Sequence, residues 1–458
     1  MRRLYAACLL GTAVAALFLL GMTVAFPGSP SFTARDPGIR SGSDAGEPLP
    51  NLTPGQLALF KAGRDEFMAT QEIADGLGPR MNLNSCVGCH LQPAAGGSSP
   101  RENPQVAFAT LDGATNVVPS FISLNGPVRE ARFVRNPDGT PDGGVHSLFT
   151  IQGRRDAPGC QLAQPDFATA AARHNVIFRI PTPVFGAGLI EQIPDAAILA
   201  NQASNAAAKR ALGIRGRPNI VFAGNAISGQ ANFNGNDGTA ARFGWKAQDK
   251  SLLLFAGEAY NVEMGITNEL FQTERDETAD CQFVAEPNDA TDTEAQSLTD
   301  ALSGTEKFAF FMRFLAPPKP SPSFPGGAPS IANGRALFDT VGCAHCHTPT
   351  MTTGPSTAVA ALSSQPVNLF SDLLVHDMGI GLADGISQGQ AGPREFRTAP
   401  LWGLGQRVFF LHDGRTSDLL VAIGQHRGTG SEANLVILRF NQLSEPNKQD
   451  LLNFLRSL

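Results

Sequence analysis

The chain has few charged residues and no block of basic ones. Lys, Arg, Asp and Glu make up 17% of its 458 residues, and its net charge is -6. Without a basic run, the composition does not support binding to nucleic acid or to an anionic membrane surface. Trp and Tyr occur only twice each, but 30 Phe residues and a 42% hydrophobic content indicate a packed interior. This length predicts two or three domains.

Cysteine is also scarce, and four of the seven Cys residues lie in two C-x-x-C-H motifs. Two thiols at this spacing each bond to a vinyl group of one porphyrin, and the following His then ligates the iron. The alternatives are a dithiol redox pair or half of a zinc site, but no other close Cys or His pair supplies the second half. We therefore predict two covalently bound c-type haems, attached through Cys86, Cys89, Cys343 and Cys346, with His90 and His347 as iron ligands.

The N-terminus predicts export. Met1-Arg2-Arg3 precedes an apolar run to Phe26 that ends with small residues, so residues 1–25 are typical of a signal peptide and the expected location is the periplasm. An uncleaved membrane anchor is the alternative, because the run is long enough to span a bilayer. Outside the leader and the two motifs, Cys160 and Cys281 remain. In an oxidising compartment they are expected to form a disulfide, with two free redox thiols as the alternative.

The two motifs lie in stretches that look like copies of one unit. Gly63-Arg64 and Phe67 precede the first motif, and Gly334-Arg335 and Phe338 precede the second. Before the first copy, residues 26–50 are rich in Pro, Gly, Ser and Asp and are expected to be a flexible linker. Thr53-Pro54-Gly55-Gln56 then predicts the start of a helix, because it supplies an N-cap, a first-turn proline and a capping-box Gln.

We predict a mainly α fold with two cytochrome c-like haem domains, at 51–316 and 330–458, joined by a Pro-rich linker at 317–329. The first domain is longer and is expected to carry a large strand- and loop-rich insertion. Residues 176–180 and 220–222 are strand-like runs, and Asn-Gly-Asn-Asp-Gly at 234–238 is typical of a turn. The expected bridge between Cys160 and Cys281 would pin this insertion.

The chain resembles the bacterial di-haem oxidoreductase family, which is related to the di-haem cytochrome c peroxidases and the MauG-type enzymes. Its members are often labelled thiol oxidoreductases or peroxidases, and their substrates are not settled. The resemblance covers nearly all of the chain after the leader. The segments that carry it are Arg179–Gly186, Gly188–Pro194, Arg242–Lys246, His376–Gly379, Phe396–Gly403 and Phe410–Arg415.

The resemblance implies two catalytic residues at the first haem. In the related peroxidases, an aromatic motif with Trp precedes a V-E-M-G element whose Glu overhangs the open haem face, and Trp245 and Glu263 are similarly placed here. The Glu would move a proton during O–O cleavage, and the Trp would carry electrons between haems. The alternatives are a solvated surface carboxylate and a Trp buried for packing alone. Leu253, Leu254 and Phe255 lie where these peroxidases place a Gln, which puts peroxide turnover in doubt.

The resemblance also indicates a sixth ligand for the second haem. His412-Asp413-Gly414-Arg415 matches an H-D-G element of the superfamily, and His426 lies near the position where peroxidases place an axial Met. We expect His347 and His426 to ligate this iron, with Met378 as the rival; two imidazoles would seal it and lower its potential. For the first haem no distal ligand is evident. Either His146 or His174 would cap it, or both are satisfied locally.

These observations predict a periplasmic di-haem oxidoreductase, peroxidase-like or MauG-like, with catalysis at the first haem and electron transfer through the second. The expected partners are a small cytochrome or cupredoxin and a small oxidant such as peroxide or dioxygen. The alternatives are a non-catalytic electron-transfer cytochrome and a di-haem oxygenase of an organic substrate. Binding of carbon monoxide or cyanide at one haem separates the enzyme from the electron carrier.

Overall fold

The structure is a computed structural model that describes residues 32–41, 44–78, 81, 83–146, 154–229, 235–275 and 278–458; of His146 only the backbone is described. Residues Ala34–Leu458 form one compact unit. The expected signal peptide at 1–25 lies outside the described residues. Within the described part of the chain, no helix is both long and apolar enough to cross a membrane.

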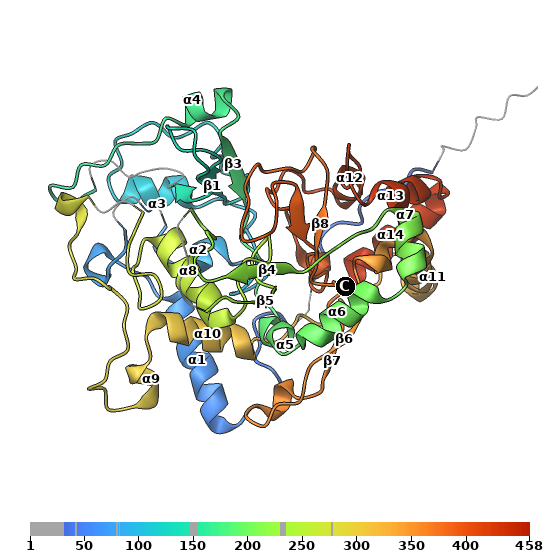
Figure 1. The fold of residues 1–458 in the computed structure, drawn as a ribbon, viewed down its shortest axis with the longest axis horizontal. Coiled ribbons are helices and arrows are strands. Elements are labelled where there is room, and N and C mark those ends of the chain that lie inside the picture. The colour runs from blue at the N-terminus through green and yellow to red at the C-terminus, as the bar shows by residue number, and fades with distance from the viewer. Residues whose placement is uncertain are drawn as a thin grey trace, which may run out of the picture. The chain divides into compact units, whose positions relative to one another are not determined.

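Two pairs of helices cross in the same way. Helix α1 (Pro54–Met68) packs against α10 (Gly304–Phe314), and α11 (Gly327–Val341) packs against α14 (Glu445–Ser457) (Figure 1). As predicted, α1 begins with a capping box: the Thr53 hydroxyl accepts from the Gln56 amide at 3.3 Å, and the Gln56 side chain accepts from the Thr53 amide at 3.0 Å.

Each crossing depends on a glycine from the repeated Gly-Arg pair. A Cβ on Gly63 would lie against the Lys307 carbonyl oxygen and 2.9 Å from Phe311 Cβ. A Cβ on Gly334 would lie against the Asp450 carbonyl oxygen and 2.7 Å from Phe454 Cβ. Carbon atoms do not approach this closely without repulsion, so the missing side chain lets each helix pair close.

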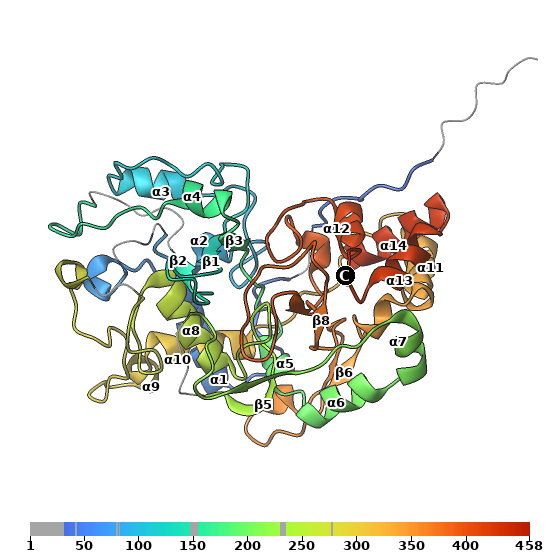
Figure 2. The same ribbon diagram turned by 45° about the horizontal axis from the view of Figure 1, so that its top comes forward.

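The aromatic residues of the two crossings belong to separate hydrophobic cores. Phe67 and Phe311 lie in the first core, with ring centroids 5.0 Å apart. Phe338 and Phe454 lie in the second, 5.6 Å apart. Figure 2 shows α1, α8 and α10 at one end of this unit and α11, α13 and α14 at the other. The predicted helix-rich class is therefore observed, with small sheets.

The other helices are short, apart from α8, which begins after the N-cap Ser251 and ends at Gly265 with φ 66°. They are η1 (Ile73–Asp75), α2 (Cys86–Cys89), α3 (Gln105–Leu111), α4 (Phe167–Ala172), α5 (Ala187–Glu191), α6 (Asp195–Ala203), α7 (Ala206–Leu212), α8 (Leu252–Met264), η2 (Ala279–Cys281), α9 (Leu298–Ala301), η3 (Cys343–His345), η4 (Ala360–Leu362), η5 (Leu404–Gln406), α12 (Leu419–Gln425) and α13 (Asn434–Asn441).

The strands form small antiparallel sheets. Strands β1 (Glu130–Phe133), β2 (Val145–His146) and β3 (Val176–Arg179) pair in the order β2-β1-β3, with Ala131 opposite both His146 and Phe178. Three two-stranded sheets pair β4 (Asn219–Phe222) with β5 (Asp237–Ala241), β6 (Met351–Thr352) with β7 (Pro366–Val367), and β8 (Val375–Asp377) with β9 (Glu395–Arg397). Strands β3 and β4 confirm the two strand-like runs seen in the sequence.

The segment expected to be a flexible linker at 26–50 differs from that expectation where it is described. Asp36 accepts two hydrogen bonds from the Arg456 guanidinium of α14, at 2.7 and 2.6 Å. Ala34 and Leu49 are buried. The composition indicated a solvated spacer, but the ion pair and the apolar contacts hold the segment against the core. The Pro-rich stretch also ends earlier than 329, because α11 begins at Gly327.

Candidate functional site

Each of the two C-x-x-C-H motifs folds into a tight turn of its own. Residues Cys86–Cys89 form α2, and Cys343–His345 form η3. In each motif the amide of the final His donates to the carbonyl of the first Cys at 2.9 Å. Cys343, Cys346 and His347 of the second motif line one cavity, as attachment to a single ring requires, and Cys89 and His90 of the first motif line another.

The two motif imidazoles are oriented by equivalent hydrogen bonds. His90 Nδ1 donates to the Gly97 carbonyl oxygen at 3.0 Å, and His347 Nδ1 donates to the Phe370 carbonyl oxygen at 3.0 Å. A backbone carbonyl on one ring nitrogen selects the tautomer whose other nitrogen carries a lone pair. Nε2 of each His is therefore prepared to bind a metal.

The cavity beside the second motif, which we call the second cavity, contains another oriented imidazole. His347 and His426 both line it, and His426 Nδ1 donates to the Ala422 carbonyl oxygen at 2.9 Å. Burial and the nearby His426 lower the pKa of His347 to about 4, and burial lowers the pKa of His426 as well. Two neutral imidazoles thus share one buried space. Met378, the rival ligand, lines the same cavity and packs with Trp245 and Phe396.

The second cavity also contains two buried guanidinium groups, Arg397 and Arg407, which are 6% and 9% exposed. Neither forms an ion pair within the described residues, and Arg397 only donates from Nε to the Gly244 carbonyl oxygen at 2.9 Å. Burial lowers the pKa of each to about 10. A buried cation needs an anion. The two propionate carboxylates of a haem would supply it, so these residues fit the cofactor that the motifs predict.

The cavity beside the first motif, which we call the first cavity, is lined by one face of α8. Phe255, Glu258, Ala259, Val262 and Glu263 follow the helical spacing and face His90 and Cys89 across the space. The predicted catalytic residue Glu263 is close to the motif, since its Oε2 lies 3.9 Å from His90 Nε2. Its side chain is 41% exposed. The carboxylate thus lies opposite the nitrogen that is free to bind iron.

Trp245 is the other predicted catalytic residue, and it lines both cavities. The residue is 8% exposed, and its Nε1 donates to the Ile180 carbonyl oxygen at 2.9 Å. On the side of the second cavity the indole meets the His412 ring edge-on at 6.4 Å. A hydrogen-bonded indole in this position separates the two spaces and contacts both.

Of the two histidines considered as caps for the first haem, only His174 has a described side chain, and it does not line the first cavity. His174 is exposed on the loop after α4, with φ 53°. The side chain of His146 lies outside the described residues. Cys160 and Cys281, expected to be bridged, are joined by a disulfide with an S–S distance of 2.04 Å.

A comparison with protein-family models matches residues 134–458 to a family described as "Di-haem oxidoreductase, putative peroxidase". The chain belongs to this di-haem oxidoreductase family. The match includes the Cys343 motif and begins after the Cys86 motif. The resemblance recognised in the sequence is therefore confirmed, and haem binding with a redox role follows from membership.

Other comparisons add little to the family assignment. No curated protein matches. A solved structure of hydrazine synthase from Kuenenia stuttgartiensis, obtained under 20 bar of xenon, matches with 19% identity and a TM-score of 0.22. The match covers 35% of this chain and 56% of that one, so the chain spans little more than half of that protein. This likeness carries no argument about the fold.

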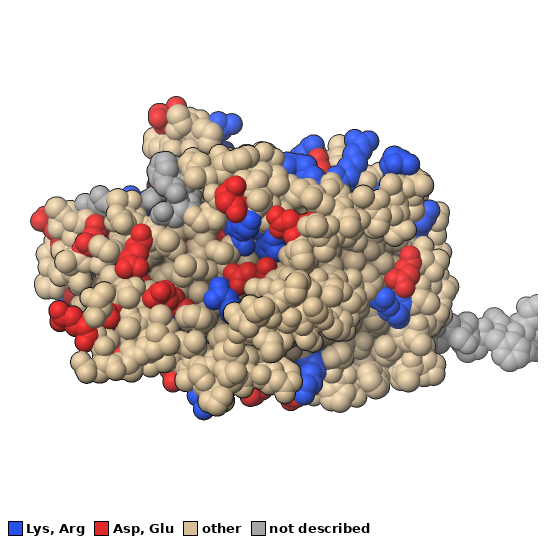
Figure 3. Space-filling model, turned by 60° about the horizontal axis from the view of Figure 1, so that its bottom comes forward, with Lys and Arg blue, Asp and Glu red and all other residues tan. Residues whose placement is uncertain are grey.

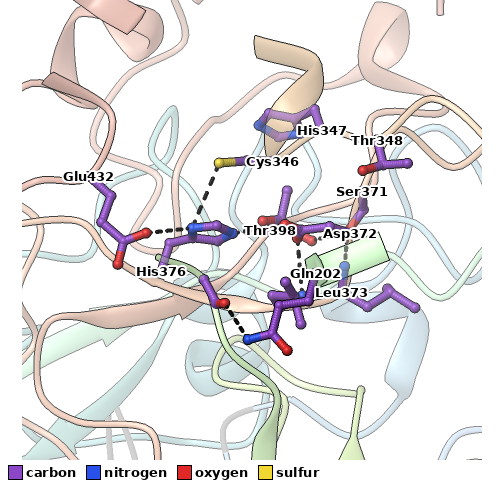
Figure 4. A network of polar contacts seen from close by, with 12 residues as sticks. Gln202, Cys346, His347, Thr348, Ser371, Asp372, Leu373, His376, Thr398 and Glu432 are labelled. Atoms are coloured by element: carbon purple, nitrogen blue, oxygen red, sulfur yellow. Dashed lines mark hydrogen bonds and ion pairs between the residues drawn. The ribbon is translucent and has the colours of Figure 1, made fainter. Parts of the chain in front are cut away.

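In this di-haem oxidoreductase, the buried imidazole of His376 lies beside the second motif, and the sequence alone assigned it no role. His376 Nδ1 lies 2.8 Å from Glu432 and Nε2 lies 2.9 Å from Asp372, while the Cys346 sulfur is 3.7 Å from Nδ1 (Figure 4). Burial opposes the charged form, but Cys346 and Asp372 together raise the pKa of His376 well above its ordinary value. Cys346, Asp372 and His376 have donor atoms suited to a metal, but both His376 nitrogens are already held by carboxylates.

The sequence analysis also missed the pair Arg397 and Arg407. Arg397 stands inside the resemblance segment Phe396–Gly403, directly after Phe396, and this position was the available signal for a buried cation that needs an anion. Arg407 had no such signal, because its burial depends on helices far along the chain. Glu258 at the first cavity was missed for the same reason, although Glu263 on the same face of α8 was predicted.

Proposed function

We propose that the chain is a periplasmic di-haem c-type oxidoreductase that reduces peroxide at the first cavity and receives electrons through the second. The observation that carries this proposal is the asymmetry of the two cavities. The second contains two oriented imidazoles, His347 and His426, whereas the described part of the first pairs His90 with carboxylates. The matching motif turns and glycine crossings support two cytochrome c-like domains with covalently attached haems.

The ligand sets favour this division of labour. His347 and His426 would together hold the iron of the second haem, and an iron held by two imidazoles does not take up a substrate. His90 is the one imidazole among the described residues that line the first cavity, and an iron that is held by one strong nitrogen ligand can take up a small molecule. The second cavity therefore suits electron transfer, and the first suits chemistry.

Reduction of hydrogen peroxide consumes two electrons and two protons and yields two waters. The bound haems would supply the electrons and the iron that binds the peroxide oxygen. Glu263 would accept the proton of the inner oxygen and return it to the outer one, because hydroxide leaves poorly unless it is protonated. Leu254 is buried and Leu253 is 37% exposed where related peroxidases carry an amide, so orientation of peroxide falls to the remaining polar side chains of the cavity.

The electrons would come from a small redox protein that contacts the second motif. Arg210, Arg215 and Arg439 are exposed and form no ion pair within the described residues, and burial, Lys209 and Arg439 lower the pKa of His345 inside that motif. Figure 3 shows basic side chains predominating towards the side of α11 and α13, and acidic ones towards α9. A cytochrome or cupredoxin with an acidic face fits this surface. The expected export signal and the Cys160–Cys281 bridge support a periplasmic location.

The test uses the full-length protein purified from a host that attaches c-type haem. Mass spectrometry is expected to find two porphyrins per chain, and Cys343→Ala with Cys346→Ala is expected to remove one of them. Spectra are expected to show one low-spin haem and one haem that binds carbon monoxide or cyanide. Peroxide consumption with a reduced donor completes the test. Two low-spin haems that bind neither ligand would contradict the proposal and favour a plain electron carrier.

A further inference from the structure

Two buried carboxyl groups meet at the inner wall of the first cavity. Asp249 is 0% exposed and Glu258 is 2% exposed. Glu258 lines the cavity from α8. Asp249 lies behind it, at the end of the turn that begins at Phe243 and contains Trp245; the amides of Arg242 and Phe243 both donate to its carbonyl oxygen at 2.9 Å.

The hydrogen bonds of the two carboxyl groups are unequal. Glu258 accepts from the Ser228 hydroxyl and, at 3.2 Å, from the Gln248 amide. Neither side-chain oxygen of Asp249 receives a hydrogen bond within the described residues. A carboxyl group that is 0% exposed and receives no hydrogen bond from the described chain is favoured in its protonated form, and the charge of the neighbouring Glu258, which Gln248 holds, acts on Asp249. Two carboxylates cannot share a hydrogen bond unless one of them carries a proton.

The surrounding charges favour one proton on the pair. Burial first, and then the charge of Glu258, raise the pKa of Asp249 well above its ordinary value, and Arg132 opposes this only partly. The guanidinium of Arg132 faces the pair. Its Nη1 donates to the Ser228 hydroxyl at 3.3 Å, and its Nε donates to the Glu130 carboxylate at 2.6 Å. One negative charge on the pair therefore has a cation nearby, and a second would be unpaired.

A glycine of the family segment makes this arrangement possible. Gly244 has φ 80°, and a Cβ there would collide with the Gln248 side chain that donates to Glu258. The turn from Phe243 to Asp249 thus places Trp245 against both cavities. The same turn places Gln248 and Asp249 beside Glu258. One short segment organises both the electron path and the acid pair.

We propose that Asp249 and Glu258 form a proton relay that delivers protons to an oxygen substrate in the first cavity. The proposal rests on the peroxide reduction proposed above. As the O–O bond breaks and two electrons enter, the shared proton moves from Asp249 to Glu258 and from there to a product oxygen, and the pair then takes up a proton from solvent; a second such transfer completes the two protons that the reduction consumes. Glu263 shuttles the peroxide's own proton between its oxygens, so the relay supplies protons that the substrate does not bring.

The shared proton is tested by infrared spectroscopy of the haem-loaded protein. We expect a C=O stretching band of a neutral carboxyl group at neutral pH. Asp249→Asn should remove the band, and Glu258→Gln should shift it, because the amide changes the hydrogen bond that Asp249 donates. Asp237→Asn is the matched control: that exposed carboxyl has a pKa of about 2 and is ionised, so its removal should leave the band intact. An unchanged band in Asp249→Asn would refute the shared proton.

The relay itself is tested by peroxide turnover and proton uptake, measured with a pH-indicator dye. Glu258→Gln should slow turnover about 10²- to 10⁴-fold, the usual effect of losing a general acid, while haem content and carbon monoxide binding persist. Asp249→Asn should also slow turnover and should change its pH profile, a readout that a purely structural role would not move. Wild-type rates and pH profiles in both variants would overturn the relay. A wild-type protein with the band but without peroxide turnover would refute the proposed function and leave the shared proton standing.

Discussion

The glycine at the second helix crossing offers the most direct test of the packing that forms the second cavity. Gly334→Ala adds one methyl group to α11 where α14 crosses it. In an open helix this change stabilises a protein by about 1 kcal/mol, because alanine loses less conformational entropy. Here the methyl group would meet the Asp450 carbonyl oxygen and lie 2.7 Å from Phe454 Cβ. Backbone atoms cannot move aside as a side-chain end can, so the helices must separate.

Overpacking of this kind costs about 1–3 kcal/mol, and the backbone obstacle indicates the upper end of that range. After the helical gain, we expect Gly334→Ala to destabilise the protein by about 2 kcal/mol. Gly424→Ala in α12 is the matched control, since no atom lies within 4 Å of its Cβ position. That variant should be more stable by about 0.5–1 kcal/mol.

Urea unfolding followed by far-ultraviolet circular dichroism measures both variants under the same conditions. The Gly334→Ala midpoint should fall and the Gly424→Ala midpoint should rise. Gly63→Ala at the first crossing should behave like Gly334→Ala, because its Cβ would meet an equivalent carbonyl oxygen, that of Lys307. If Gly334→Ala proves as stable as Gly424→Ala, the close crossing does not exist as described.

Further predictions concern the cofactors, the acid pair and the disulfide. His426→Met should keep the second haem low-spin but raise its reduction potential in a redox titration, because a thioether favours ferrous iron; an unchanged potential would remove His426 from the ligand set. Trp245→Phe should preserve haem content but slow electron transfer between haems in stopped-flow traces, and unaltered transfer would leave Trp245 as a packing residue. The raised pKa of Asp249 means that the folded chain holds a proton that the unfolded chain releases. The stability that this proton adds is present below pH 3.8, the ordinary pKa of an Asp carboxyl, and is lost as the pH rises through the pKa of Asp249 in the folded chain. Asp249→Asn should therefore flatten the fall in unfolding free energy that sets in as the pH rises above 3.8, by up to about 1.4 kcal/mol per pH unit. Replacing Cys160 and Cys281 with Ser opens a link across 121 residues and should cost up to about 5 kcal/mol; no loss in urea unfolding would show that the bridge is dispensable.

Local features were predictable from the sequence because neighbouring residues determine them. The Thr53 capping box needs only residues within one helical turn, and the strand-like run at 176–180 is confirmed by β3 apart from its last residue. The C-x-x-C-H spacing likewise requires no knowledge of the fold. The segment 26–50 shows the opposite case. Its composition indicated a flexible linker, but Asp36 pairs with Arg456, 420 residues away.

The sequence by itself determined the family, the two cysteine motifs and their histidines, and a helix-rich fold. These features depend on short spacings in the sequence and on combinations of residue types that rarely occur together in other kinds of protein. Only the tertiary structure decided which side chains share a cavity. Trp245 lines both cavities, and Arg397 and Arg407 line the second one without an ion pair among the described residues, because helices and turns from distant parts of the chain pack there. Asp249 and Glu258 are close in the sequence, but their burial comes from the same packing. Burial and charge pairing arise from that packing, and no local pattern encodes them.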